Sequence, residues 1–136
     1  MAIVLDACAA LAAVLPDEDS DYGEAAVEAG LKEGILAPSL WPYEVQNGLL
    51  TALRRKRLAE ENLGQVLEAL RAFAPKLCPA EGLGTELRIA HQHTVSAYDA
   101  AYLALAIAVN GRLATTDQRL RAAAGSARVT LFTPPS

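Results

Sequence analysis

Short apolar runs alternate with longer amphipathic or alanine-rich segments along the whole chain. Apolar runs bounded by charges, glycine or proline are typical of buried strands, and the segments between them have helical periodicity. Strands alternating with helices indicate an α/β fold with a mostly parallel, four- or five-stranded sheet. No repeat or linker interrupts the pattern, so we expect one domain spanning residues 1–136. The predicted strands are 2–6, 35–37, 76–80, 112–116 and 127–132, and the predicted helices are 7–15, 20–32, 41–58, 60–73, 84–91, 96–109 and 118–124.

Four acidic residues fall near the starts of predicted helices or the ends of predicted strands. Asp6 closes the run AIVLD, and Asp117 follows RLATT. Glu44 in WPYEV and Asp99 in SAYDAAYLALAIAV fall in first helical turns. Because ligand sites of parallel sheets lie beyond the carboxyl ends of the strands, all four side chains can face one crevice.

Each of these carboxylates also has a purely structural interpretation. Asp6 and Asp117 can cap the helices that follow them. Ser96 with Asp99 fits a capping box, and Glu44 suits the positive end of a helix dipole. Capping does not require apolar surroundings, however, and Asp6 and Asp99 both lie within apolar runs. The four together therefore favour a shared site.

Carboxylates that share a crevice repel one another strongly. At ~4 Å and an effective dielectric of ~20, each like-charged pair costs about 4 kcal/mol. Either some of the groups are protonated or divalent cations neutralise them. A set of oxygen donors favours Mg²⁺ or Mn²⁺, which can activate water for in-line displacement at phosphorus.

Four segments, LDACAALA, EVQN, SAYDAAYLALA and LATTDQRL, occur in an order and spacing that resemble the PIN-domain ribonucleases. The likeness extends over nearly the whole chain and is strongest to the VapC toxins of type II toxin–antitoxin systems. It implies a three-layer α/β/α PIN-like fold and a cytoplasmic endoribonuclease. It also implies that Mg²⁺ or Mn²⁺ activates the water that cleaves the RNA phosphodiester.

The resemblance also assigns roles to individual residues. By this resemblance, the catalytic and metal-binding acidic residues are Asp6, Glu44, Asp99 and Asp117, and the supporting polar residues are Thr115 and Asn47.

Cys8 departs from the family pattern, because such proteins often carry serine two residues after the first aspartate. A thiol is a weaker hydrogen-bonding group than a hydroxyl, so we interpret Cys8 as a neighbour of the site rather than a ligand. A catalytic thiol has little support, since neither His91 nor His93 shares a motif with Cys8. We interpret both histidines as structural.

The net charge of −4 hides an uneven distribution. Residues 17–33 carry seven acidic residues, including Asp17 and Glu18, against one lysine, and we interpret them as a solvated helix face. With this segment and the four site carboxylates set aside, the rest of the chain is basic. The run RRKR at residues 54–57 can simply end a helix, where cations suit the dipole, and can also bind phosphate. The arginines along which we expect RNA to approach are Arg54, Arg55, Arg57, Arg119 and Arg121.

Apolar residues make up 52% of the chain, which is high for a small soluble domain and indicates a surface covered by partners. By resemblance, these partners are a second copy of the chain and an antitoxin that inserts a basic side chain into the acidic pocket. We expect no membrane association, because the start lacks a signal peptide and the uncharged runs are too short to span a bilayer. Two cysteines without a CxxC or HExxH motif suit a reducing cytoplasm and give a zinc site little support.

Two other functions remain open, and a third is disfavoured. The first is a PIN-like fold kept only for binding, in which the acidic residues act as helix caps. The second is a DNA-directed metal-dependent nuclease. A phosphoacceptor receiver domain requires adjacent acidic residues near the first strand and a lysine near a late strand. It is disfavoured because the only lysines in the sequence are Lys32, Lys56 and Lys76.

Overall fold

The computed structural model describes residues 1–16 and 19–136. Asp17 and Glu18 of the acidic segment lie outside the described residues. The sheet has four short parallel strands in the order β3-β2-β1-β4, as the alternating pattern predicts. Their bounds are β1 Ile3–Leu5, β2 Ile35–Pro38, β3 Lys76–Cys78 and β4 Arg112–Ala114.

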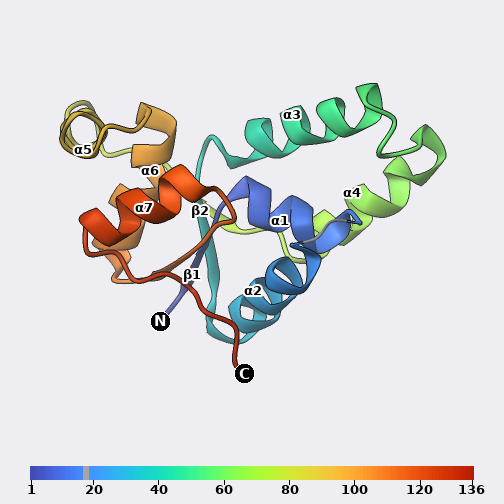
Figure 1. Cartoon of the computed structure of the whole chain (residues 1–136), viewed down its shortest axis with the longest axis horizontal. Coiled ribbons are helices and arrows are strands. Elements are labelled where there is room, and N and C mark those ends of the chain that lie inside the picture. Colours follow the sequence, from blue (N-terminus) through green and yellow to red (C-terminus); the bar gives the residue numbers. More distant parts are fainter. Residues whose placement is uncertain (17–18) are drawn as a thin grey trace.

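Helices connect all the strands and flank the sheet on both sides (Figure 1). α2 packs on β1 and β2, whereas α6 packs on β1, β2 and β4 from the other side, which gives the three-layer α/β/α arrangement. α3 and α4 extend together to one side of the molecule, and α5 lies at the opposite end (Figure 1). The helices are α1 Ala7–Val14, α2 Ser20–Glu33, α3 Trp41–Arg54, α4 Leu63–Ala72, α5 Thr85–His93, α6 Ala97–Val109 and α7 Gln118–Ser126, and a 3₁₀ turn, η1, spans Glu60–Asn62.

The core forms where the central strand meets its covering helices. Ile3, Val4 and Leu5 of β1 are all fully buried, which explains why this strand is an uninterrupted apolar run. α1 and α6 are apolar around most of their circumference because each packs between other elements. Burial of β1 fixes the position of the residue that follows it, Asp6.

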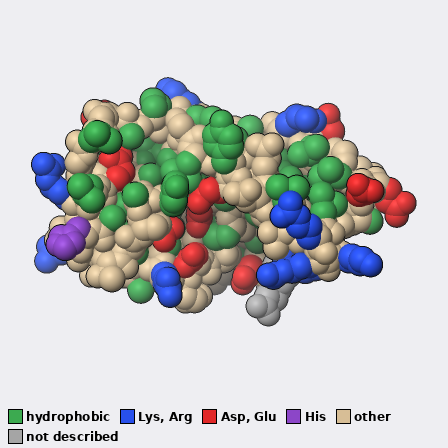
Figure 2. All heavy atoms as spheres, turned by 90° about the horizontal axis from the view of Figure 1, so that it is seen from above, with side chains coloured by type: hydrophobic (Ala, Val, Ile, Leu, Met, Phe, Trp, Pro, Cys, Tyr) green, Lys and Arg blue, Asp and Glu red, His purple; other side chains and the backbone are tan. Residues whose placement is uncertain are grey.

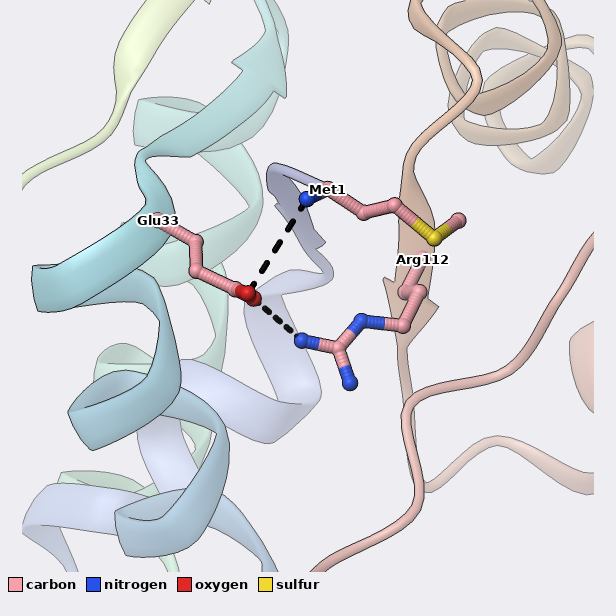
Figure 3. A network of polar contacts seen from close by, with 3 residues as sticks. All are labelled: Met1, Glu33 and Arg112. Carbon is pink, nitrogen blue, oxygen red and sulfur yellow. Dashed lines mark hydrogen bonds and ion pairs between the residues drawn. The ribbon is translucent and has the colours of Figure 1, made fainter.

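A second set of contacts closes the amino-terminal edge of the sheet (Figure 3). Arg112 at the start of β4 is hydrogen-bonded to Glu33 at the end of α2, and the Met1 amino group lies 3.9 Å from the same carboxylate. The Arg112 guanidinium also lies over the Phe132 ring, 5.3 Å from its centre. These contacts are partly exposed, so they orient the ends of α2 and β4 more than they stabilise the fold.

Two predicted elements differ most from the structure. The strand expected at 127–132 is reduced to one bridge between Leu113 and Leu131, after a turn in which Arg128 has a φ of +59°. The helix expected over 41–58 ends at Arg54, because Lys56 takes a φ of +57° and the Arg57 N–H bonds back to the Ala52 carbonyl.

Several other elements are shorter or longer than predicted. The strands predicted at 76–80 and 112–116 end at Cys78 and Ala114, and helix α7 continues past Gly125 to Ser126. The early end of β4 leaves Thr115 and Thr116 in the loop that leads to Asp117. Among the described residues, no helix is both long and apolar enough to cross a membrane.

The close packing of α1 on α2 gives a prediction about stability. A Cβ at Gly23 would lie 2.6 Å from the Ala9 carbonyl oxygen and from the Ala13 nitrogen, both backbone atoms that cannot move aside. We expect Gly23→Ala to lower the free energy of unfolding by about 1–3 kcal/mol. The control Gly64→Ala, where no described atom lies within 4 Å of the new Cβ, should be neutral or stabilise by up to about 1 kcal/mol. Urea unfolding measures both, and equal effects of the two substitutions would contradict the packing argument.

Candidate active site

The four predicted acidic residues meet at the carboxyl edge of the sheet. Asp6 follows β1, Asp117 follows β4, and Glu44 and Asp99 lie in the first turns of α3 and α6. Their charges are close enough to act on one another: Asp6 and Asp99 both affect Glu44, and Asp6 and Asp117 both affect Asp99. Figure 2 views the molecule from above and shows acidic side chains gathered around the middle of this face, with Lys and Arg side chains around them.

Asp6 is the most deeply buried of the four, with 8% of its surface exposed. The Thr115 hydroxyl donates to Asp6 Oδ2 at 2.6 Å, and the Cys8 thiol donates to the same oxygen at 2.9 Å. Asp6 occupies the N-cap position of α1, but among the described residues its side chain makes no capping hydrogen bond. The capping interpretation therefore does not explain why a carboxylate is buried here.

The environment of Asp6 opposes its charge. Burial raises the pKa of the Asp6 carboxyl, and the charge of Asp117 raises it further. The hydrogen bonds from Cys8 and Thr115 lower this pKa and so offset part of the rise. The folded protein thus holds a carboxylate whose ionised form is destabilised until a positive charge reaches it.

Capping does account for part of the geometry around Asp99 and Asp117. Asp117 Oδ1 accepts hydrogen bonds from the backbone N–H groups of Arg119 and Leu120, at 2.8 and 3.2 Å. At the start of α6 the Ser96 hydroxyl oxygen accepts from the Asp99 N–H at 3.0 Å, so Ser96 is the cap. The Asp99 carboxylate is thus left to face the other acidic groups.

Glu44 is held by a residue that the sequence analysis did not identify. The Tyr102 hydroxyl donates to Glu44 Oε1 at 2.6 Å, and Tyr102 is fully buried. A tyrosine three residues after Asp99 lies on the same face of the helix, and this spacing is the signal that could have identified it.

Burial and neighbouring charges act in the same direction on the two half-exposed carboxylates. Burial raises the pKa of Glu44, and Asp6 and Asp99 add to the rise, while the Tyr102 hydrogen bond opposes it. Burial also raises the pKa of Asp99, followed by the charges of Asp117 and Asp6, while Ser96 and Arg119 oppose the rise. Three of the four carboxylates are therefore in surroundings that disfavour a negative charge.

Cys8 lies within this cluster, as a neighbour of Asp6. Its sulfur also lies 3.4 Å from the Thr115 hydroxyl oxygen and accepts the Thr116 N–H at 3.4 Å. Burial, together with the Asp6 charge, raises the pKa of the Cys8 thiol to about 11. A protonated thiol is a poor nucleophile, so this geometry does not support a catalytic cysteine.

The loop that carries Thr115 is held by a second residue that the sequence analysis missed, Tyr22 of α2. The Tyr22 hydroxyl accepts the Thr115 N–H at 3.3 Å and donates to the Phe132 carbonyl at 3.1 Å. Arg121 donates to the Thr115 carbonyl at 2.9 Å, and its guanidinium lies over the Tyr22 ring. Arg121, predicted to approach RNA, is thus engaged within the protein.

The remaining predicted residues lie around the carboxylates. Asn47 and Arg57 line an open cavity of about 350 Å³ beside Cys8, and Arg119 lines another of about 650 Å³ together with Asp99. Arg54, Arg55 and Arg57 are exposed at and just after the end of α3. This cluster ends the helix, and of its members Arg57 lies beside the site.

The donor set suits a hard cation. The surroundings of Asp6, Glu44 and Asp99 disfavour their ionised forms, which a cation would stabilise, and all the donor atoms of the carboxylates are oxygens. Within residues 1–16 and 19–136, no three His, Cys, Asp or Glu side chains are arranged so that they could hold a metal ion. Mg²⁺ commonly keeps several waters and binds one or two carboxylates directly, so this more open arrangement still fits that ion.

Comparison with known proteins identifies the class of the chain. The PIN domain family model matches residues 3–126, and the chain belongs to this family. It is 38% identical over 123 residues to ribonuclease VapC3 of Pyrobaculum aerophilum, covering 88% of this chain and 92% of that protein. It is 37% identical over 118 residues to ribonuclease VapC9 of Mycobacterium tuberculosis, covering 87% of each. The fold is similar to the crystal structure of PAE2754 from Pyrobaculum aerophilum, with a TM-score of 0.63 and 22% identity over 90% of this chain and 84% of that one.

The burial of Asp6 gives a prediction about pH. Because its folded-state pKa is raised, the folded protein binds more protons than the unfolded chain between the usual aspartate pKa and the raised one. The stability of the metal-free protein should therefore increase as the pH falls through the raised pKa of Asp6 towards the usual aspartate value. In the Asp6→Asn variant this increase in stability at lower pH should be smaller. At pH 7 the free energy of unfolding of the variant should exceed that of the wild type by about 1 kcal/mol.

Urea unfolding in chelator at several pH values measures this effect. Asn retains a carbonyl oxygen that can accept the Thr115 and Cys8 hydrogen bonds, so the substitution mainly removes charge. A variant that is less stable than the wild type at pH 7, with an unchanged pH dependence, would contradict the prediction.

Proposed function

We propose that this protein is a Mg²⁺- or Mn²⁺-dependent endoribonuclease and the toxin of a toxin–antitoxin pair. The observation that carries the proposal is the convergence of Asp6, Glu44, Asp99 and Asp117 at one edge of the sheet, with raised pKa values for three of them. Burying such charges is costly unless a cation or a proton balances them. The relatives named as VapC ribonucleases support RNA as the substrate.

A divalent ion at this edge would polarise the phosphate and make a water nucleophilic at neutral pH. Asp6, Asp99 and Asp117 would hold it, one or two of them directly and the rest through water, and Glu44 would complete a second site or orient the attacking water. Thr115 keeps the Asp6 carboxylate in place by its hydrogen bond. The exposed cations Arg54, Arg55, Arg57 and Arg119 would bind neighbouring phosphates of the RNA.

The proposal includes an antitoxin and a second copy of the chain as partners. Several large apolar side chains are exposed, among them Leu50 on α3 and Leu87 on α5. Exposed apolar surface on a domain of this size favours burial against another protein. An arginine from the antitoxin would pair with the same carboxylates that hold the metal, and so inhibit the enzyme.

Cleavage of a pool of cellular RNA tests the proposal directly. We expect the purified wild type to cleave RNA when Mg²⁺ or Mn²⁺ is present, and we expect cleavage to stop when a chelator is added. Asp99→Asn should lower the rate at least about a hundredfold, because it removes a ligand charge, while Ser96 still caps α6 and the fold persists. Circular dichroism checks that the variant is folded.

Two controls separate the alternatives. Cleavage that survives both chelator and Asp99→Asn would overturn the metal-dependent mechanism. Cleavage of single-stranded DNA but not of RNA would identify a DNA-directed nuclease, and binding of RNA without cleavage would favour a non-catalytic module.

A further inference from the structure

Tyr102 is a buried polar side chain that touches the acidic cluster from the core side. It lies on α6, three residues after Asp99, and reaches across to Glu44 on α3. Its hydroxyl donates to Glu44 Oε1 at 2.6 Å, which is a short hydrogen bond. The bond therefore joins the two helices whose first turns carry Glu44 and Asp99.

This bond opposes forces that would move Glu44 away. Glutamate has a long, flexible side chain, and Glu44 is repelled by the charges of both Asp6 and Asp99. Moving towards solvent lowers the free energy of a side chain under such repulsion, because its charge is better hydrated there. A hydrogen bond to a charged group contributes about 1.5–3 kcal/mol, so the Tyr102 bond offsets part of this repulsion and favours the position of Glu44 within the cluster.

The chemical nature of the donor is important. A lysine or arginine in this place would neutralise Glu44 and remove the negative charge that attracts a cation. A phenol donates a hydrogen bond and remains neutral. Tyr102 therefore constrains the Glu44 carboxylate without neutralising it. Its hydrogen bond goes to Oε1, so the other carboxylate oxygen, Oε2, is not bound by Tyr102.

We propose that Tyr102 is a positioning residue that holds the Glu44 carboxylate in the acidic cluster so that Glu44 can act on a divalent cation or on the attacking water. This inference rests on the function proposed above and refines it. In this proposal Tyr102 acts through Glu44, to which its hydroxyl is bonded, and does not itself bind substrate or metal.

The simpler alternative is that Tyr102 only fills the core, and Tyr102→Phe distinguishes the two. Phenylalanine keeps the ring and removes only the oxygen, so packing is preserved. We expect the dissociation constant for Mn²⁺, measured on the metal-free protein by titration calorimetry, to rise about tenfold, as for outer-shell partners of metal ligands. We also expect kcat for RNA cleavage to fall while KM stays within about twofold, because the RNA-binding cations are untouched.

A double-mutant cycle with Glu44→Gln supplies the decisive comparison. If Tyr102 acts through Glu44, Tyr102→Phe should raise the Mn²⁺ dissociation constant in the wild-type background but have almost no further effect in the Glu44→Gln background. Tyr98→Phe is the matched control, because Tyr98 lies on the same helix with 66% of its surface exposed. This control should leave Mn²⁺ binding unchanged.

Equal effects of Tyr102→Phe in both backgrounds, or no effect in either, would overturn the inference. A wild type that binds Mn²⁺ but does not cleave RNA would overturn the proposed nuclease function, while the binding cycle would still decide the role of Tyr102. A folded wild type that neither binds Mn²⁺ nor cleaves RNA would overturn both.

Discussion

The repulsion among carboxylates at the carboxyl edge of the sheet is the constraint on which the rest of the site depends. Burial raises the pKa of the Asp6 carboxyl, and the charge of Asp117 raises it further. The fold tolerates this cost because β1, the strand that precedes Asp6, is fully buried and leaves the residue no alternative position. Such a stored unfavourable interaction is typical of functional sites, where a ligand relieves it.

Uncharged donors surround the cluster and hold its members in place. Thr115 and Cys8 hold Asp6, the loop carrying Thr115 is in turn bonded to Tyr22, and Tyr102 holds Glu44. Because hydroxyl and thiol groups orient carboxylates without neutralising them, the site remains negatively charged. Among the cations, Arg119 lies close enough to Asp99 to lower its pKa, and Arg121 supports the Thr115 loop.

The sequence was sufficient to predict the parallel α/β architecture and the placement of the four acidic residues at one edge of the sheet, because both depend on local pattern. Asp6 and Asp117 could be placed from the ends of apolar runs, and parallel strands bring such ends to one edge. The contacts made by Tyr102 and Tyr22 join residues 58 and 93 positions apart. The spacing of Tyr102 from Asp99 places it on the site face of its helix, but no local pattern identifies the partner of either tyrosine. The fifth strand was wrongly predicted because residues 127–132 have an apolar composition, whereas a turn at Arg128 allows only one bridge.

Thermal unfolding in the presence of Mn²⁺ tests the central claim most directly, because it reports cation binding without any assumption about substrate. A cation that binds only the folded protein raises the melting temperature in proportion to the logarithm of its concentration once sites are filled. We predict that millimolar Mn²⁺ raises the melting temperature of the wild type by several degrees relative to NaCl of equal ionic strength, and that Asp99→Asn loses most of this increase. An identical melting temperature of the wild type in Mn²⁺ and in NaCl would contradict the account.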